Sequence, residues 1–328
     1  MNDTHPSTKP PEATKSNRCI CCATETRGGC VACAEAPEYV PGDAQEVLYC
    51  SADCEFKDSL NHQDHCNAMK ERKKLLRCAE LLRDSFLAFR EVLFDLSLKA
   101  ITFDNGQLML HPDERGQSDL SLRFPFPDNL TSNPAHKAAA LLYCQCTAAA
   151  FMLAPMARSL LKEVCSKVEV CSLSMRSNPE SRPIQTLVVG TTVRENYHTV
   201  LVVTLRLSEE QWVIDTTGGQ FGHQEVIVPY KKYMDEKGSL LASPLVPYDY
   251  GLVDDLDMCR NNSPLDPYDV EGVYFMAAAR DRQWFARFVD KYVRDDFLHG
   301  LDCDMRLLSE AFIAGLKDHL RRFQFNGT

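Results

Sequence analysis

Paired cysteine and histidine residues near the start of the chain constrain its fold more than any other feature. Of the fifteen cysteines among 328 residues, eight lie before residue 67. Seven of them form, with one histidine, four closely spaced pairs: Cys19 and Cys22, Cys30 and Cys33, Cys50 and Cys54, His62 and Cys66. A CxxC turn offers two ligands from one loop, and residues four apart on a helix share a face. Zinc binds four such ligands in a tetrahedron, so eight ligands predict two closed, structural zinc ions.

Two of the eight ligands have a neighbouring residue of the same type that could replace them. Cys21 stands directly beside Cys22, and His65 stands close to His62, although the spacing favours Cys22 and His62. Because no apolar signal segment precedes the cluster, and the cytosol and nucleus keep thiols reduced, metal binding is favoured over a disulfide framework. We therefore expect an intracellular protein, in the nucleus or the cytoplasm.

The end of this cluster resembles the MYND zinc finger. The run YCSADC at residues 49–54, followed by His62 and Cys66, matches the family ending Y-C-S-x-x-C-x7-H-x3-C. A departure is Ser59, where the family usually has tryptophan. The resemblance implies interleaved pairs, with one zinc on Cys19, Cys22, Cys50 and Cys54 and the other on Cys30, Cys33, His62 and Cys66. It also implies docking to a short proline-containing peptide of a partner protein.

Composition argues against nucleic-acid and membrane partners. The chain has 36 Lys and Arg against 46 Asp and Glu, a net charge of -10, whereas phosphate binding needs a basic surface. No apolar run approaches the 18 or so residues that cross a bilayer. The expected partner is therefore another protein.

The rest of the chain predicts an α+β fold after the finger. The expected organisation is a disordered tail at 1–17, the finger at 18–67, an amphipathic linker helix at 68–100 and an α+β domain at 101–328. Within that domain, Asp104-Asn105-Gly106 predicts a short hairpin. Pro134 after Asn133 signals a helix start, and Pro155 must kink or end a segment of the helical stretch that follows. Runs rich in β-formers then predict strands at 167–175, 184–193, 198–207 and 211–215, in a domain with an antiparallel sheet. Helices are expected at 273–297 and 305–325.

The order of these elements resembles that of transglutaminase-like and other papain-like domains. A helix bearing Cys144 and Cys146 precedes a strand that begins at His198 and a strand that ends in Asp215. The run WVIDTT at 212–217 matches the family's W-x-x-D-x-T ending. If a hairpin joins the two strands, His198 and Asp215 lie close together across the ladder. The resemblance implies Cys146 as nucleophile, with Cys144 as the alternate, His198 as its activator and Asp215 as the group that orients the ring.

Two functions fit this reading. The favoured one is a zinc-dependent interaction adaptor or regulator, whose finger docks on a partner while the larger domain serves as a scaffold. The alternative is a cysteine-dependent acyl transferase or hydrolase recruited by its finger. Cys144 and Cys146 lie in an apolar run with no preceding glycine, which is also typical of buried core cysteines. The sequence therefore favours the adaptor over the enzyme.

Overall fold

The computed structural model of this protein combines helices with largely antiparallel sheets, as the sequence predicts. It describes residues 17–26, 28–113, 123–176, 179–191, 197–240, 245–248, 270–293 and 302–326. The predicted tail therefore lies outside the described residues, apart from Asn17. The chain divides into two compact units, Met1–Lys70 and Glu71–Thr328. Among the described residues, no helix is long and apolar enough to cross a membrane.

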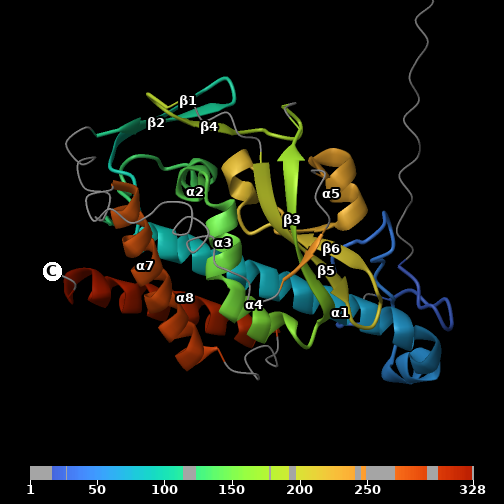
Figure 1. The fold of residues 1–328 in the computed structure, drawn as a ribbon. Helices are drawn as coiled ribbons and strands as arrows, with labels where there is room; N and C mark the ends of the chain where they lie inside the picture. Colours follow the sequence, from blue (N-terminus) through green and yellow to red (C-terminus); the bar gives the residue numbers. More distant parts are fainter. Residues whose placement is uncertain are drawn as a thin grey trace, which may run out of the picture. The chain divides into compact units, whose positions relative to one another are not determined.

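The long helix α1 (Ala52–Val92) starts and ends earlier than the expected helix at 68–100 (Figure 1). The helix starts earlier because the segment 52–66, which contains Cys54, His62 and Cys66, is already helical. It ends earlier because Phe94 leaves the helix to pair with Phe124, after which residues 98–104 form a strand. The finger and the following helix therefore share one continuous element.

A small sheet carries the predicted hairpin. Strands β1 (Leu98–Asp104) and β2 (Gln107–Pro112) pair antiparallel, with Asp104 opposite Gln107. The two residues between them, Asn105 and Gly106, have φ of 48° and 79°. Asparagine and glycine favour these left-handed angles, which a tight type I′ turn needs, so the hairpin prediction is confirmed. Strand β4 (Gln185–Val188) joins the free edge of β2 in parallel.

The larger sheet has the strand order β7-β6-β5-β3-β8, and β9 also pairs with β3. Its members all pair antiparallel: β3 (Cys165–Met175), β5 (Tyr197–Leu205), β6 (Gln211–Ile214), β7 (Ile227–Pro229), β8 (Gly238–Leu240) and β9 (Val246–Pro247). Strands β5 and β6 form the expected hairpin, with Thr204 opposite Gln211 and Leu201 opposite Ile214. Buried residues such as Val202 and Val213 build the core on this hairpin. The hairpin matters for function because its open end carries His198 and Asp215.

The expected helical stretch after Asn133 is broken into three helices, α2 (Pro134–Leu142), α3 (Cys146–Met152) and α4 (Ala154–Leu161). Asn133 caps α2 by accepting from the backbone N–H groups of Ala135 and His136, so the predicted start is confirmed. Pro155 lies in the first turn of α4, where its missing N–H is harmless. The remaining helices are α5 (Tyr230–Glu236), α7 (Val270–Tyr292) and α8 (Asp302–Asn326), of which α7 and α8 pack together (Figure 1).

A buried carboxylate at Glu71 joins α1 to the turn of the β5–β6 hairpin. It accepts hydrogen bonds from the backbone N–H groups of residues 206–208 at 2.9 to 3.1 Å, and from the Ser208 hydroxyl at 3.1 Å. Beside it, the buried Arg72 guanidinium donates to Glu210, at 2.8 Å from Nε to Oε2. These contacts anchor the hairpin at the end opposite to His198.

Candidate metal centres and cysteine site

The first metal centre lies at the start of α1. Cys50 and Cys54 come from the turn that leads into the helix and from its first turn, and Cys19 and Cys22 come from a preceding loop. The sulfur atoms of Cys22 and Cys50 are 3.4 Å apart, those of Cys50 and Cys54 are 3.6 Å apart, and those of Cys54 and Cys22 are 3.9 Å apart. The first and third pairs of the sequence thus meet in one cluster.

The second metal centre lies further along the same helix. It combines Cys30 and Cys33, from a tight turn, with His62 and Cys66, which share one face of α1. Cys30 Sγ lies 3.8 Å from Cys66 Sγ, and Cys33 Sγ lies 3.2 Å from His62 Nε2. All four residues are buried.

The geometry of both clusters fits zinc. In each cluster the four ligand atoms lie within 4.8 Å of one another. A tetrahedral zinc with Zn–S bonds near 2.3 Å keeps its sulfurs about 3.8 Å apart, close to the separations seen here. These separations are far longer than the disulfide bond of about 2 Å, and the cysteines are free thiols. The two clusters are consistent with two structural zinc ions, with four protein ligands each and therefore no open position.

The two alternative ligands stand outside these clusters. The Cys21 thiol donates to the carbonyl oxygen of Cys54 at 3.1 Å, and the ring of His65 lies 5.5 Å from that of His62. Neither residue belongs to the two ligand sets, whose members are the residues that spacing favours.

The hydrophobic core of the finger is small. Apart from the ligands, its buried members are Ala36, Tyr49 and Met69. Tyr49 also donates its hydroxyl to Asp58 at 2.8 Å. A core of this size buries too little apolar area to fold a chain by itself, so metal binding has to supply the missing stability.

In the second unit, Cys146 is the first residue of α3. The chain reaches it through a sharp turn in which Cys144 adopts a left-handed backbone with φ of 55°. Because glycine normally takes this conformation, a cysteine at position 144 is no signal of a turn. The thiol of Cys144 is exposed, whereas Cys146 is partly buried. Thr147 holds α3 on the sheet through a hydrogen bond of 3.1 Å between its hydroxyl and that of Thr199 in β5.

His198 and Asp215 lie together at the open end of the β5–β6 hairpin. His198 Nε2 is 2.9 Å from Asp215 Oδ1, and both residues are buried. Asp215 accepts two further hydrogen bonds, from the Tyr233 hydroxyl at 2.8 Å and from the backbone N–H of Thr217 at 3.2 Å. Three hydrogen-bonding groups therefore hold the carboxylate, and Nδ1 is the ring nitrogen of His198 that Asp215 does not contact.

The electrostatics of this site favour a reactive cysteine. Burial alone would raise the pKa of Cys146, but its hydrogen bond to His198 and the charge of that ring outweigh burial and lower the pKa to about 7. Burial likewise opposes charge on His198, yet the charge and hydrogen bond of Asp215 raise the pKa of the imidazole to about 10. Against burial, His198 lowers the pKa of Asp215 to about 2. The three groups are thus coupled in the order that a thiol, a base and an orienting carboxylate need.

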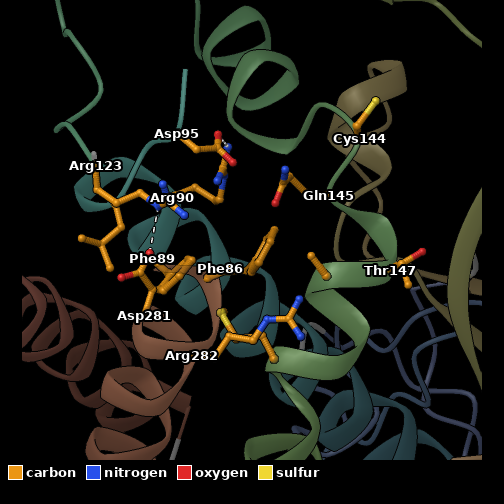
Figure 2. A pocket seen from close by; sticks show the side chains of 14 residues that line it. Phe86, Phe89, Arg90, Asp95, Arg123, Cys144, Gln145, Thr147, Asp281 and Arg282 are labelled. Carbon is orange, nitrogen blue, oxygen red and sulfur yellow. Dashed lines mark hydrogen bonds and ion pairs between the residues drawn. The ribbon is translucent and has the colours of Figure 1, made fainter. Parts of the chain in front are cut away.

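A cavity of about 180 Å³ adjoins the turn that leads into α3. Its apolar wall contains Phe86, Phe89, Leu93 and Met152, and its charged wall contains Arg90, Asp95, Arg123, Asp281 and Arg282. Figure 2 shows the Gln145 side chain extending toward Phe86 and Arg90, whereas Cys144 points away from them. Cys144, Gln145 and Thr147 line this cavity, so it reaches both neighbours of Cys146 in the chain.

Sequence reasoning missed two residues of this site. Tyr233, from α5, holds Asp215, and Gln220, from the Gly-rich turn after β6, places its side-chain Nε2 3.2 Å from Nδ1 of His198. Only the short distance of Gln220 from Asp215 along the chain could have suggested it.

No protein-family model, no curated protein and no solved structure matches this chain.

Proposed function

We propose that this protein is a cysteine-dependent acyl transferase or hydrolase of transglutaminase-like fold, with a MYND-type finger that recruits its substrate protein. The observation that carries the proposal is geometric. Thr147, next to Cys146 at the start of α3, hydrogen bonds to Thr199, next to His198 in β5, at 3.1 Å, and Asp215 holds the buried His198 at 2.9 Å. A thiol pKa of about 7 makes a large share of Cys146 thiolate at neutral pH.

In the proposed reaction, the thiol proton of Cys146 passes to Nδ1 of His198 and the thiolate attacks a carbonyl carbon. The sulfur–carbon bond forms while the carbonyl electron pair moves to oxygen. When the carbonyl reforms, the leaving group departs with the proton from Nδ1, and a thioester remains. Water or an amine then attacks the thioester, gives its proton to Nδ1 and releases the acyl group, which restores the thiol. Asp215 keeps Nε2–H of the ring bound throughout, so Nδ1 is the nitrogen left to exchange the proton.

The cavity beside Cys144 and Gln145 is the proposed site for the substrate side chain. Its apolar wall suits an aliphatic or aromatic group. Arg90 pairs with Asp95, and Arg123 pairs with Asp281, at 2.5 and 2.8 Å.

Selective alkylation tests this function. The zinc-loaded full-length chain is treated with substoichiometric iodoacetamide at neutral pH, and labelled peptides are identified by mass spectrometry. We expect Cys146 to react fastest and to lose this advantage in His198→Ala. Cys171 is a matched control because it is buried in β3 and burial raises the pKa of its thiol to about 11. Labelling of Cys146 no faster than that of an ordinary free thiol excludes the enzyme.

A second candidate function is that of an interaction adaptor, and one observation on the finger favours it. Phe56 and Leu60 lie one turn apart on α1 and are 80% and 84% exposed. Residues four apart on a helix form one surface, and exposed aromatic and aliphatic side chains are typical of protein-binding sites. This apolar pair flanks Ser59, the position where MYND fingers usually carry tryptophan, and so supplies apolar contacts for a proline-containing peptide.

The adaptor function is tested by titrating immobilised full-length protein with a proline-rich peptide library. Binding should weaken at least tenfold in a Phe56→Ser, Leu60→Ser double variant that still holds two zinc ions. A matched control is Leu308→Ser, because Leu308 is exposed on α8, far along the chain. Equal binding by the double variant and the wild type contradicts docking at this surface.

A further inference from the structure

The side-chain amide of Gln220 contacts the ring nitrogen that the proposed reaction uses. Its Nε2 lies 3.2 Å from Nδ1 of His198, and the residue is buried. Its backbone is fixed on both sides, because its N–H donates to the Thr217 carbonyl at 3.0 Å and its carbonyl accepts from the Thr186 hydroxyl at 3.2 Å. The turn ends at Gly222, whose φ of 87° favours glycine. The amide is therefore held at this atom by the fold.

Nδ1 of His198 has two competing partners. Nε2 is bound to Asp215, so a neutral ring that donates from Nε2 to this carboxylate presents a lone pair at Nδ1. Gln220 Nε2, an amide donor, fits that lone pair. Proton transfer from Cys146 would place a hydrogen on Nδ1, and an N–H cannot accept a hydrogen bond from the amide. The contact to Gln220 thus favours the neutral ring over the imidazolium.

We propose that Gln220 is a positioning residue that donates to Nδ1 of neutral His198, orients the ring and opposes formation of the imidazolium–thiolate pair. The effect of Gln220 on the orientation and pKa of His198 is independent of the proposed function. Its effect on the ionisation of Cys146 rests on the proposed function. The Gly-rich turn after β6, which carries Gln220, thereby controls the protonation of His198. A neutral hydrogen bond of this kind changes the protonation equilibrium of the ring about fivefold, which corresponds to about 0.7 pH unit in its pKa.

The other titratable groups around His198 are Cys146 from α3, Asp215 after β6, Tyr233 from α5, and His223 after the Gly-rich turn. Burial and the charge on Lys237 lower the pKa of His223 to about 4, and burial beside Asp215 holds the pKa of Tyr233 well above its usual value. Neither group changes charge between pH 5 and pH 9. A shift in that window therefore reports on Cys146 and His198.

The first experiment measures the pH dependence of Cys146 alkylation by iodoacetamide in the zinc-loaded full-length protein. In Gln220→Ala we expect the inflection to move down by about 0.7 pH unit, because the restraint on the imidazolium is gone. Gln185→Ala is the matched control, since Gln185 is exposed on β4.

The second experiment reads the ring directly, so the inference remains testable even if Cys146 is unreactive. Nitrogen-15 NMR of histidine-labelled protein in a Cys146→Ser background gives the tautomer and pKa of His198. We expect Nδ1 to be unprotonated in the neutral ring, and the pKa to rise by about 0.7 unit on Gln220→Ala. An unchanged pKa, a fall in pKa, or a proton on Nδ1 of the neutral ring overturns the role of Gln220. Failure of the proposed function alone leaves this shift in place, while Cys146 alkylates no faster than an ordinary thiol.

Discussion

Glu71→Ala should destabilise the second unit strongly, because one buried carboxylate anchors the turn of the β5–β6 hairpin. The substitution removes four hydrogen bonds of 2.9 to 3.1 Å, three of them to successive backbone N–H groups at residues 206–208. Hydrogen bonds to a charged group contribute about 1.5–3 kcal/mol each. Leu207 in this turn is 68% exposed, so water replaces part of the lost bonding. We therefore expect a loss of about 3 kcal/mol rather than the full sum.

Urea unfolding followed by tryptophan fluorescence measures this loss. The chain has two tryptophans, and both, Trp212 and Trp284, lie in the second unit. Trp212 donates its indole N–H to Glu210 at 3.2 Å, beside the anchored turn, and is therefore a local reporter. Glu71→Gln keeps one acceptor oxygen without the charge. Its loss in free energy of unfolding should be about half that of Glu71→Ala.

A surface substitution provides the control for this measurement. Glu310 on α8 pairs with Arg306 at 3.8 Å, and its side chain is 66% exposed. Glu310→Ala should change the free energy of unfolding by less than about 0.5 kcal/mol. If Glu71→Ala has an effect as small as Glu310→Ala, the anchoring role of Glu71 is wrong.

Three further predictions concern the cysteine site and the finger. Asp215→Asn removes the charge that sustains the imidazolium of His198, so the pH inflection of Cys146 alkylation should rise from about 7 toward the ordinary thiol value, measured by peptide mapping. Gly218→Ala would place a Cβ 2.7 Å from Asp215 Oδ2. We therefore expect the free energy of unfolding in urea to fall by about 1–3 kcal/mol and the contact between Asp215 and His198 to weaken. Wild-type stability would contradict the close packing. Chelation of zinc at neutral pH should unfold the finger, with a loss of far-UV circular dichroism but little change in tryptophan fluorescence. A parallel loss of both signals would contradict independent folding of the second unit.

Local signals in the sequence predicted the parts of the fold that depend on short segments. Asn105 and Gly106 carry the backbone angles of a tight turn by themselves, so the hairpin was predictable. The four ligand pairs have spacings that only a turn or a helix face satisfies, so two zinc clusters could be expected. The proximity of His198 and Asp215 followed from the alternation of a two-strand ladder.

The remaining features depend on tertiary packing. Cys144 takes a left-handed conformation without being glycine, so the break between α2 and α3 left no mark in the sequence. Tyr233 and Gln220 reach the site from α5 and from a Gly-rich turn, and only the folded sheet brings them to Asp215 and His198. The end of α1 was likewise misjudged, because apolar residues continue at helical spacing into β1.

Acylation of Cys146 tests the central claim most directly. Zinc-loaded wild-type protein and Cys146→Ser are mixed with p-nitrophenyl acetate, and the burst of p-nitrophenol is followed alongside intact mass. We expect a stoichiometric burst with an acetyl group mapped to Cys146, a much slower burst in His198→Ala and none in Cys146→Ser. A wild-type protein that shows no burst, or a burst that Cys146→Ser retains, would contradict it.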